Sequence, residues 1–122
     1  MTLALLVSIA AGLGAVARYL VDTVVQHRHR GSFPLGTMTI NVAGSFVLGL
    51  VTGLATHHGL SSRTTIVVGV GFCGGFTTFS TWMWESLVLA QNRAQRAAVV
   101  NTFGSLMLGL VAAGAGLGLA LL

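Results

Sequence analysis

Four long apolar stretches, separated by short polar loops, constrain the fold of this 122-residue chain more than any other feature. They cover about residues 2–25, 34–56, 64–90 and 97–121. Each is long enough for the roughly 20 residues that a helix needs to cross a membrane. None alternates apolar and polar residues, which argues against membrane-spanning strands. The pattern predicts an all-α membrane protein with four transmembrane helices in a single domain, residues 1–122.

The composition supports a membrane location and argues against two other classes of protein. Hydrophobic residues make up 54% of the chain and charged residues only 7%, whereas about a quarter of the residues in a soluble domain are charged. The net charge of +4 comes from scattered arginines. In so apolar a chain we expect these arginines at lipid headgroups, so no nucleic acid partner is expected. No nucleophile–base pair or phosphate-binding loop is evident, so we expect no enzyme activity.

The third apolar stretch is unusual because it contains the sequence "GFCGGFTTFSTW" at residues 71–82. A continuous helix over residues 64–90 would be about 40 Å long, against a hydrocarbon core of about 30 Å. Each glycine costs about 1 kcal/mol relative to alanine inside a helix. We therefore expect the third helix to break near Gly74–Gly75, which would free backbone carbonyls for a cation or a helix N-terminus for an anion. Alternatively, the glycines only permit close helix packing.

Polar residues recur on three of the four stretches. They are Thr37, Asn41 and Ser45 on the second, Thr77, Thr78, Ser80 and Thr81 on the third, and Asn101 and Ser105 on the fourth. The spacing i, i+4 on the second and fourth stretches puts each set on one helix face. Such groups either hold helices together or line a shared polar conduit. Three polar stripes favour the conduit, although adhesion between helices is the alternative for each residue.

Arg18 and Glu85 are the ionisable residues expected within the spans. Because the first and third helices should run in the same direction, these two residues should lie at similar depth. An ion pair between them is one interpretation. The other is that the Arg18 side chain extends to the lipid headgroups.

Three motifs resemble the signatures of the Fluc (CrcB) family of fluoride ion channels. They are "GAVARY" at 14–19, "GTMTINVAGSFVLG" at 36–49 and "GFCGGFTTFSTW" at 71–82. The resemblance covers the whole chain, with its weakest match in the fourth stretch. There, Asn101 stands where an aromatic residue is often found and Gly109 where a hydroxyl is expected.

The resemblance implies a passive, fluoride-selective channel in the plasma membrane, built as an antiparallel dual-topology dimer. Such a channel would export cytoplasmic fluoride and relieve its toxicity. It also implies a structural Na⁺ at the dimer centre, held by the backbone carbonyls of Gly74 and Thr77. Arg18 corresponds to an arginine near the vestibule, and Glu85 is expected to have a vestibule or structural role.

The resemblance further implies a fluoride pore lined by phenylalanines and hydrogen-bond donors. The expected pore residues are Phe76, Phe79, Asn41, Thr78, Ser80 and Ser105. Hydroxyls and amide groups can replace the water around fluoride. A phenyl edge is electropositive and can face an anion without binding it tightly. The i, i+3 spacing of Phe76 and Phe79 predicts that both rings lie on one helix face.

Two other functions remain open at the level of sequence. A small four-helix multidrug or cation exporter would need a membrane-embedded carboxylate in the first helix, where Asp22 lies close to the end. A non-conducting membrane assembly subunit would need no such group.

The loops differ in charge. The loops after the first and third stretches carry Arg28, Arg30, Arg93 and Arg96, while the opposite side has only Arg63 and the N-terminal amine. Because basic loops stay in the cytoplasm, this bias predicts that both termini lie outside. An antiparallel dimer needs chains in both orientations. It would be a heterodimer with an oppositely oriented paralogue if this chain inserts in one orientation, and a homodimer if it inserts in both.

Overall fold

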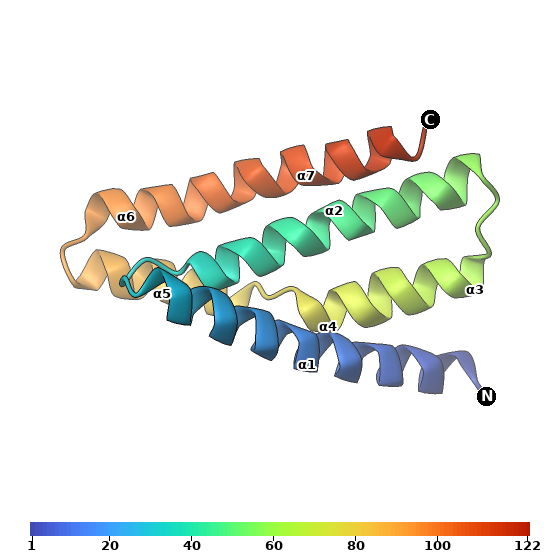
Figure 1. Ribbon diagram of the computed structural model, residues 1–122, viewed down its shortest axis with the longest axis horizontal. Helices are drawn as coiled ribbons and strands as arrows, with labels where there is room; N and C mark the ends of the chain where they lie inside the picture. Colours follow the sequence, from blue (N-terminus) through green and yellow to red (C-terminus); the bar gives the residue numbers. More distant parts are fainter.

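The computed structural model describes all residues, 1–122, and contains only helices and connecting loops. Four helices are long and apolar enough to cross a membrane: Leu3–His29, Leu35–His57, Ser62–Gln91 and Gln95–Leu119. They run along one another in alternating directions (Figure 1). End A of the molecule carries both termini and the loop at residues 58–61, and end B carries the loops at residues 30–34 and 92–94. The all-helical, four-span prediction is confirmed.

The first two spans are continuous helices. α1 (Leu3–His29) continues past the predicted end at residue 25. It ends where Arg30 adopts a left-handed backbone conformation, with φ 53°, and donates its N–H to the Gln26 carbonyl over 3.2 Å. α2 (Leu35–His57) follows Pro34 directly, a residue whose missing N–H costs nothing at the start of a helix.

The third span is divided into four helical segments. They are α3 (Ser62–Thr65), the π-helical η1 (Ile66–Cys73), α4 (Gly74–Phe76) and α5 (Ser80–Gln91). The break begins at Thr77, whose backbone is extended at φ −82° and ψ 163°. The expected break is therefore present, but it begins after the double glycine and not within it, because Gly74 and Gly75 both keep helical geometry.

The two glycines before the break differ in their surroundings. A Cβ atom at Gly75 would overlap the backbone carbonyl of Ala11, so this glycine allows the third span to approach α1 closely. Gly14 on α1 has the same role, since a Cβ there would overlap the Phe72 carbonyl. A Cβ at Gly74 would meet nothing within 4 Å, because Gly74 faces open space.

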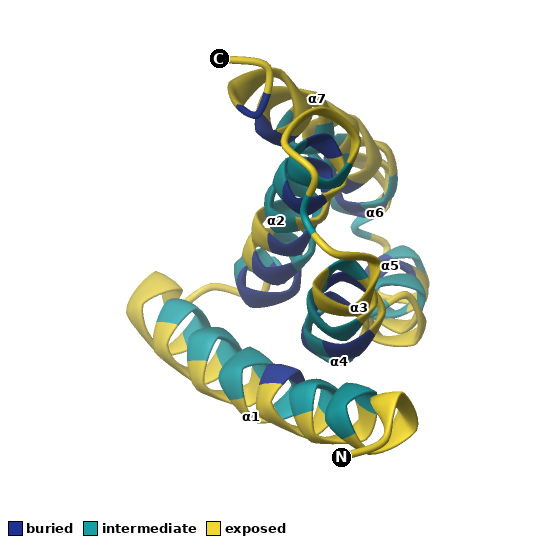
Figure 2. Ribbon diagram, turned by 90° about the vertical axis from the view of Figure 1, so that its right-hand side faces the viewer, coloured by how far each residue is buried: buried dark blue, intermediate teal, exposed yellow.

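The fourth span packs along α2. It consists of α6 (Gln95–Val99), the π-helical η2 (Val100–Gly104) and α7 (Ser105–Leu119). Glycines again permit close approach, because a Cβ at Gly49 would overlap the Ala113 carbonyl and one at Gly116 would overlap the Phe46 carbonyl. Figure 2 shows that the buried residues of the helices face one another and that the outer faces are exposed. Only 20 of the 122 residues are buried, so most apolar side chains are left to contact lipid or another subunit.

Candidate functional site

A cleft of ≈ 380 Å³ opens beside the break in the third span. Its walls come from α2, from the third span and from the fourth span, and they contain no charged residue. Six residues predicted from the sequence line it: Asn41, Gly74, Thr77, Thr78, Phe79 and Ser105. The predicted residues Phe76, Ser80, Arg18 and Glu85 do not line it. The cleft is therefore largely apolar, with a few polar groups on its walls.

Asn41 on α2 holds the broken backbone. Its Nδ2 donates to the Thr78 carbonyl over 2.8 Å, and its Oδ1 accepts from the Thr78 N–H over 2.8 Å. In a continuous α-helix the Thr78 N–H would donate to the Gly74 carbonyl. Asn41 thus replaces a helical hydrogen bond and leaves the Gly74 carbonyl without that partner.

Arg18 also contacts the break, since its guanidinium donates to the Thr77 carbonyl over 3.1 Å. Glu85 instead accepts from the Thr37 hydroxyl over 2.9 Å, and its other carboxylate oxygen is buried without a hydrogen-bond partner. The ion pair considered from the sequence is therefore not formed. The extended Thr77 backbone provides Arg18 with an acceptor that a continuous helix would not offer.

Phe79 and Trp82 are the aromatic residues on the cleft wall. Phe79 is 71% exposed, and its ring meets Trp82 edge to face, with centroids 5.7 Å apart and planes at 86°. Phe76 is buried and stacks on Phe72 at 5.7 Å, away from the cleft. The break separates Phe76 from Phe79, so their i, i+3 spacing does not put them on one face. Phe79 and Trp82 have the same spacing at the start of the unbroken α5.

Trp82 was not among the pore residues expected from the sequence. The sequence does contain a signal for Trp82, because it lies three residues after Phe79. This spacing puts the two rings on one face of the helix that begins after the break. Its indole N–H donates to the Asn101 carbonyl over 2.9 Å. Asn101 is completely buried in the π-helical η2, and its Nδ2 donates to the Ser86 hydroxyl over 2.8 Å. The fourth span therefore fixes the position of the Trp82 ring.

Ser105 carries the most informative polar group in the cleft wall. The residue is 4% exposed, and its hydroxyl is buried without any hydrogen-bond partner. Buried polar groups without a partner are rare, and each one needs an explanation. Ser45 brings a second hydroxyl to the wall from α2, whereas Ser80 is exposed outside it. The cleft wall therefore contains a buried hydroxyl that no other group in the chain binds.

The cation ligands that the chain offers at the cleft are backbone carbonyls. No group of three or more His, Cys, Asp or Glu residues comes together to hold a metal ion. The carbonyl of Gly74 has lost its helical partner, and that of Thr77 accepts only from Arg18 among the side chains. Neutral oxygens of unwound helices suit Na⁺. Two carbonyls are too few to enclose an ion, so a single chain provides only part of such a site.

Comparisons with known proteins agree on one family. A family model described as CrcB-like protein, Camphor Resistance (CrcB), matches residues 5–117. The chain is 56% identical over 113 residues to fluoride-specific ion channel FluC 1 of Leifsonia xyli, covering 93% of this chain and 82% of the relative. It is 45% identical over 114 residues to fluoride-specific ion channel FluC 2 of Cutibacterium acnes, covering 93% of each. It is 42% identical over 107 residues to FluC 2 of Mycobacterium tuberculosis, covering 88% of this chain and 82% of the relative.

Proposed function

Because the chain belongs to the CrcB family, we propose that it is a passive fluoride channel. It is a multi-pass membrane protein, and in a bacterium that membrane is the plasma membrane. HF crosses bilayers as a neutral molecule and dissociates inside the cell. A channel lets the trapped anion leave down its electrochemical gradient. Export of cytoplasmic fluoride and relief of its toxicity are the proposed purpose.

The observation that carries this proposal is the unpaired Ser105 hydroxyl in a cleft without charged walls. Fluoride is strongly hydrated and needs replacement donors, which a buried hydroxyl with no other partner supplies. The absence of carboxylates from the wall removes a repulsion that an anion would otherwise meet. Arg18 does not line the cleft, but its guanidinium donates to the carbonyl of the lining residue Thr77 and adds an attractive charge behind the wall.

The aromatic pair of Phe79 and Trp82 provides the rest of the proposed path. The edges of aromatic rings carry a partial positive charge. They attract an anion weakly, and conduction needs contacts that are favourable but easily released. In this structure Trp82, and not Phe76, is the aromatic partner of Phe79 in the wall. We therefore assign the aromatic part of the path to Phe79 and Trp82, with Phe76 packed behind it.

A dimer is part of the proposal because one chain leaves its cleft open. Phe79 is 71% exposed although it lies on the cleft wall, so a second surface is needed to close the path. An oppositely oriented second copy, or an oppositely oriented paralogue, would provide this surface. The Gly74 and Thr77 carbonyls of two chains would then hold a structural Na⁺, which would neutralise the partial charges of the freed carbonyls at the dimer centre.

Fluoride efflux from proteoliposomes tests the proposed function directly. Purified protein should release internal fluoride, measured with an external fluoride electrode, and should release chloride far more slowly. A proton-coupled cation exporter would release no fluoride, and Asp22, the carboxylate such an exporter would need in helix 1, lies outside the cleft. Fluoride release no faster than from protein-free liposomes would refute the proposal.

The proposed Na⁺ site has a test that does not depend on transport. Ligands that bind only the folded state raise the melting temperature. The assembled protein should therefore melt at a lower temperature when Na⁺ is replaced by the large cation N-methylglucamine at equal ionic strength. Thr77→Ser should behave like the wild type, because the ligand is a backbone oxygen. Identical melting in both salts would rule out a structural Na⁺.

A further inference from the structure

A second groove, of ≈ 490 Å³, lies at end B, away from the cleft. Its walls include Phe33, which precedes α2, and Arg93 and Arg96, which flank the start of the fourth span. It also includes Val100, one turn further into that span. No acidic residue lines the groove. It is therefore a basic site at the boundary between a loop and a transmembrane helix.

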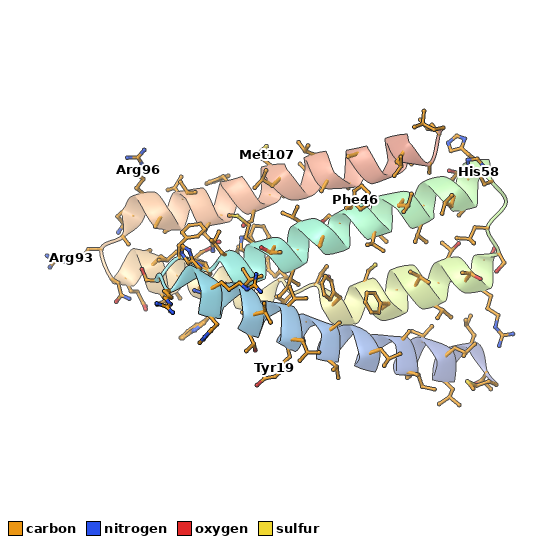
Figure 3. The ribbon with its side chains drawn as sticks, viewed as in Figure 1. Tyr19, Phe46, His58, Arg93, Arg96 and Met107 are labelled. Atoms are coloured by element: carbon orange, nitrogen blue, oxygen red, sulfur yellow. The ribbon has the colours of Figure 1, made fainter.

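The arginines of this groove have all their guanidinium donors available. Arg18 donates to the Thr77 carbonyl and Arg63 to the Met1 carbonyl over 2.8 Å, whereas Arg28 and Arg30 at end B are unpaired like the two in the groove. The guanidinium groups of Arg93 and Arg96 form no hydrogen bond or ion pair within the chain. Figure 3 shows both side chains extending away from the helices at end B, Arg93 beyond the end of the molecule and Arg96 to the side of α6. A guanidinium has five N–H donors and binds phosphate in a bidentate manner.

The groove changes from charged to apolar along its length. Arg93 lies in the loop before the fourth span and Arg96 in the first turn of that span, whereas Val100, 48% exposed, lies one turn further in. Phe33 adds an apolar side chain from the neighbouring loop. A phospholipid has the same order of groups, with its phosphate at the membrane surface and its acyl chains deeper. We propose that this groove binds an anionic phospholipid, with its negatively charged headgroup near Arg93 and Arg96 and the start of an acyl chain on Phe33 and Val100.

The backbone of Arg93 determines which substitution can test its side chain. Arg93 has φ 60°, in the left-handed region that favours glycine. Arg30, also at end B, has a similar φ of 53°. Glycine can therefore replace either arginine without backbone strain.

The charge of the groove favours lipid at one membrane surface. The cytoplasmic leaflet is rich in anionic lipids, and basic pockets between transmembrane helices on that side bind their headgroups. End B carries most of the arginines of the loops. The proposed lipid site does not depend on fluoride conduction, because none of its residues lines the cleft.

Native mass spectrometry of the full-length protein in mild detergent tests the site. Phosphatidylglycerol and phosphatidylcholine with the same acyl chains would be titrated separately, and bound lipid counted. The wild type should retain more phosphatidylglycerol than phosphatidylcholine. Arg93→Gly should weaken its binding roughly fivefold, and Arg93→Gly with Arg96→Gln roughly 25-fold, as expected for the loss of one and two charges near a lipid phosphate.

Arg30→Gly is the matched control. Arg30 also has a positive φ, of 53°, and lies at end B, but it does not line the groove. Both glycine variants relieve backbone strain and remove one charge, so both should fold, and only Arg93→Gly should lose phosphatidylglycerol. Equal losses in both variants, or no preference over phosphatidylcholine, would overturn the proposal. Full displacement of the lipid by millimolar glycerol phosphate would overturn it too, because the groove would then bind a soluble phosphate.

Discussion

Phe79 and Phe76 lie three residues apart but in opposite environments. The Phe79 ring is 71% exposed on the cleft wall, whereas Phe76 is buried against Phe72. Phe79→Ile should therefore abolish most fluoride efflux while the melting temperature stays close to that of the wild type. Phe76→Ala should instead lower the melting temperature, since emptying a packed site costs a few kcal/mol. Efflux assays and thermal unfolding of both variants measure the two effects separately.

The test compares a loss of efflux in Phe79→Ile with a loss of stability in Phe76→Ala. Phe79→Leu is a further control, because it keeps an apolar side chain of similar size and removes only the ring. Undiminished efflux in Phe79→Ile and Phe79→Leu would remove aromatic edges from the mechanism. A Phe79 variant that loses efflux and also fails to assemble would show that the ring serves packing between subunits.

The Ser105 hydroxyl is expected to act on the anion and not on the fold. Because its oxygen has no hydrogen-bond partner in the chain, Ser105→Ala should leave stability unchanged. Hydrogen bonds to charged groups contribute about 1.5–3 kcal/mol, so fluoride efflux should fall roughly tenfold or more. Ser105→Thr, which keeps the hydroxyl, should retain more activity than Ser105→Ala.

A matched variant on the neighbouring helix checks the assignment of Ser105. The Ser86 hydroxyl donates to the Trp82 carbonyl and accepts from the Asn101 amide. Ser86→Ala should therefore reduce stability, since it leaves the buried Asn101 amide without its acceptor. Equal stability losses in the Ser105 and Ser86 alanine variants would mean that Ser105 also has a structural partner.

The double glycine of the third span provides a prediction at the scale of a helix. Gly75→Ala should prevent the close packing of α4 on α1, because its Cβ would overlap the Ala11 carbonyl and backbone atoms cannot move aside cheaply. Gly74→Ala should leave the fold of the single chain intact, because no atom lies within 4 Å of its Cβ position. Thermal unfolding in detergent should therefore show a much larger loss of stability for Gly75→Ala.

The Gly74 variant also informs on assembly. If the open space beside Gly74 is filled by a second chain, Gly74→Ala should fold as a monomer but form fewer dimers, as measured by size-exclusion chromatography with light scattering. Comparable stability of the two alanine variants would contradict the packing of α1 against the third span described by the structure.

Sequence reasoning found the broken helix but not the contact that determines its position. Helix propensity favours a break at the glycines, whereas the break begins at Thr77 because Asn41, on another helix, holds both polar groups of the Thr78 backbone. Contacts between residues 37 positions apart are not visible in local propensity. For the same reason the sequence did not indicate that Arg18 would donate to the Thr77 carbonyl and not to Glu85. It also did not indicate that the Phe79 ring would contact Trp82.

The number of helices and the small residues between them were easier to predict from the sequence than the side-chain contacts at the break. Hydrophobic length alone gave the number of spans, since each stretch must cross the same thickness of membrane. Gly49 and Gly53 are four residues apart on α2, and both lie at close contacts with the fourth span. Gly114 and Gly118 are also four residues apart but face open space, while Gly116 makes the contact with α2. Spacing identifies a small-residue face but does not decide which of two neighbouring faces is packed.

At the scale of the molecule, the arginines in and beside the loops divide unequally between the two ends. End B carries Arg28, Arg30, Arg93 and Arg96, whereas end A has only Arg63, in the first turn of the third span. The Arg63 guanidinium donates to the neutral Met1 carbonyl and keeps its charge, so the comparison is four arginines against one. Because basic loops are retained in the cytoplasm, we expect end B to lie in the cytoplasm in most molecules, with both termini outside.

Cysteine labelling in intact cells measures this orientation. Cys73 is the only cysteine and is 3% exposed, so a Cys73→Ala background permits single cysteines to be placed at residue 2 and in the loop at residues 92–94. A membrane-impermeant maleimide should label residue 2 from outside and label the loop only after the cells are opened. A chain with this preference would need a partner of opposite charge bias to form an antiparallel dimer. Equal labelling of both sites from outside would mean that the chain inserts in both orientations, and a homodimer would then suffice.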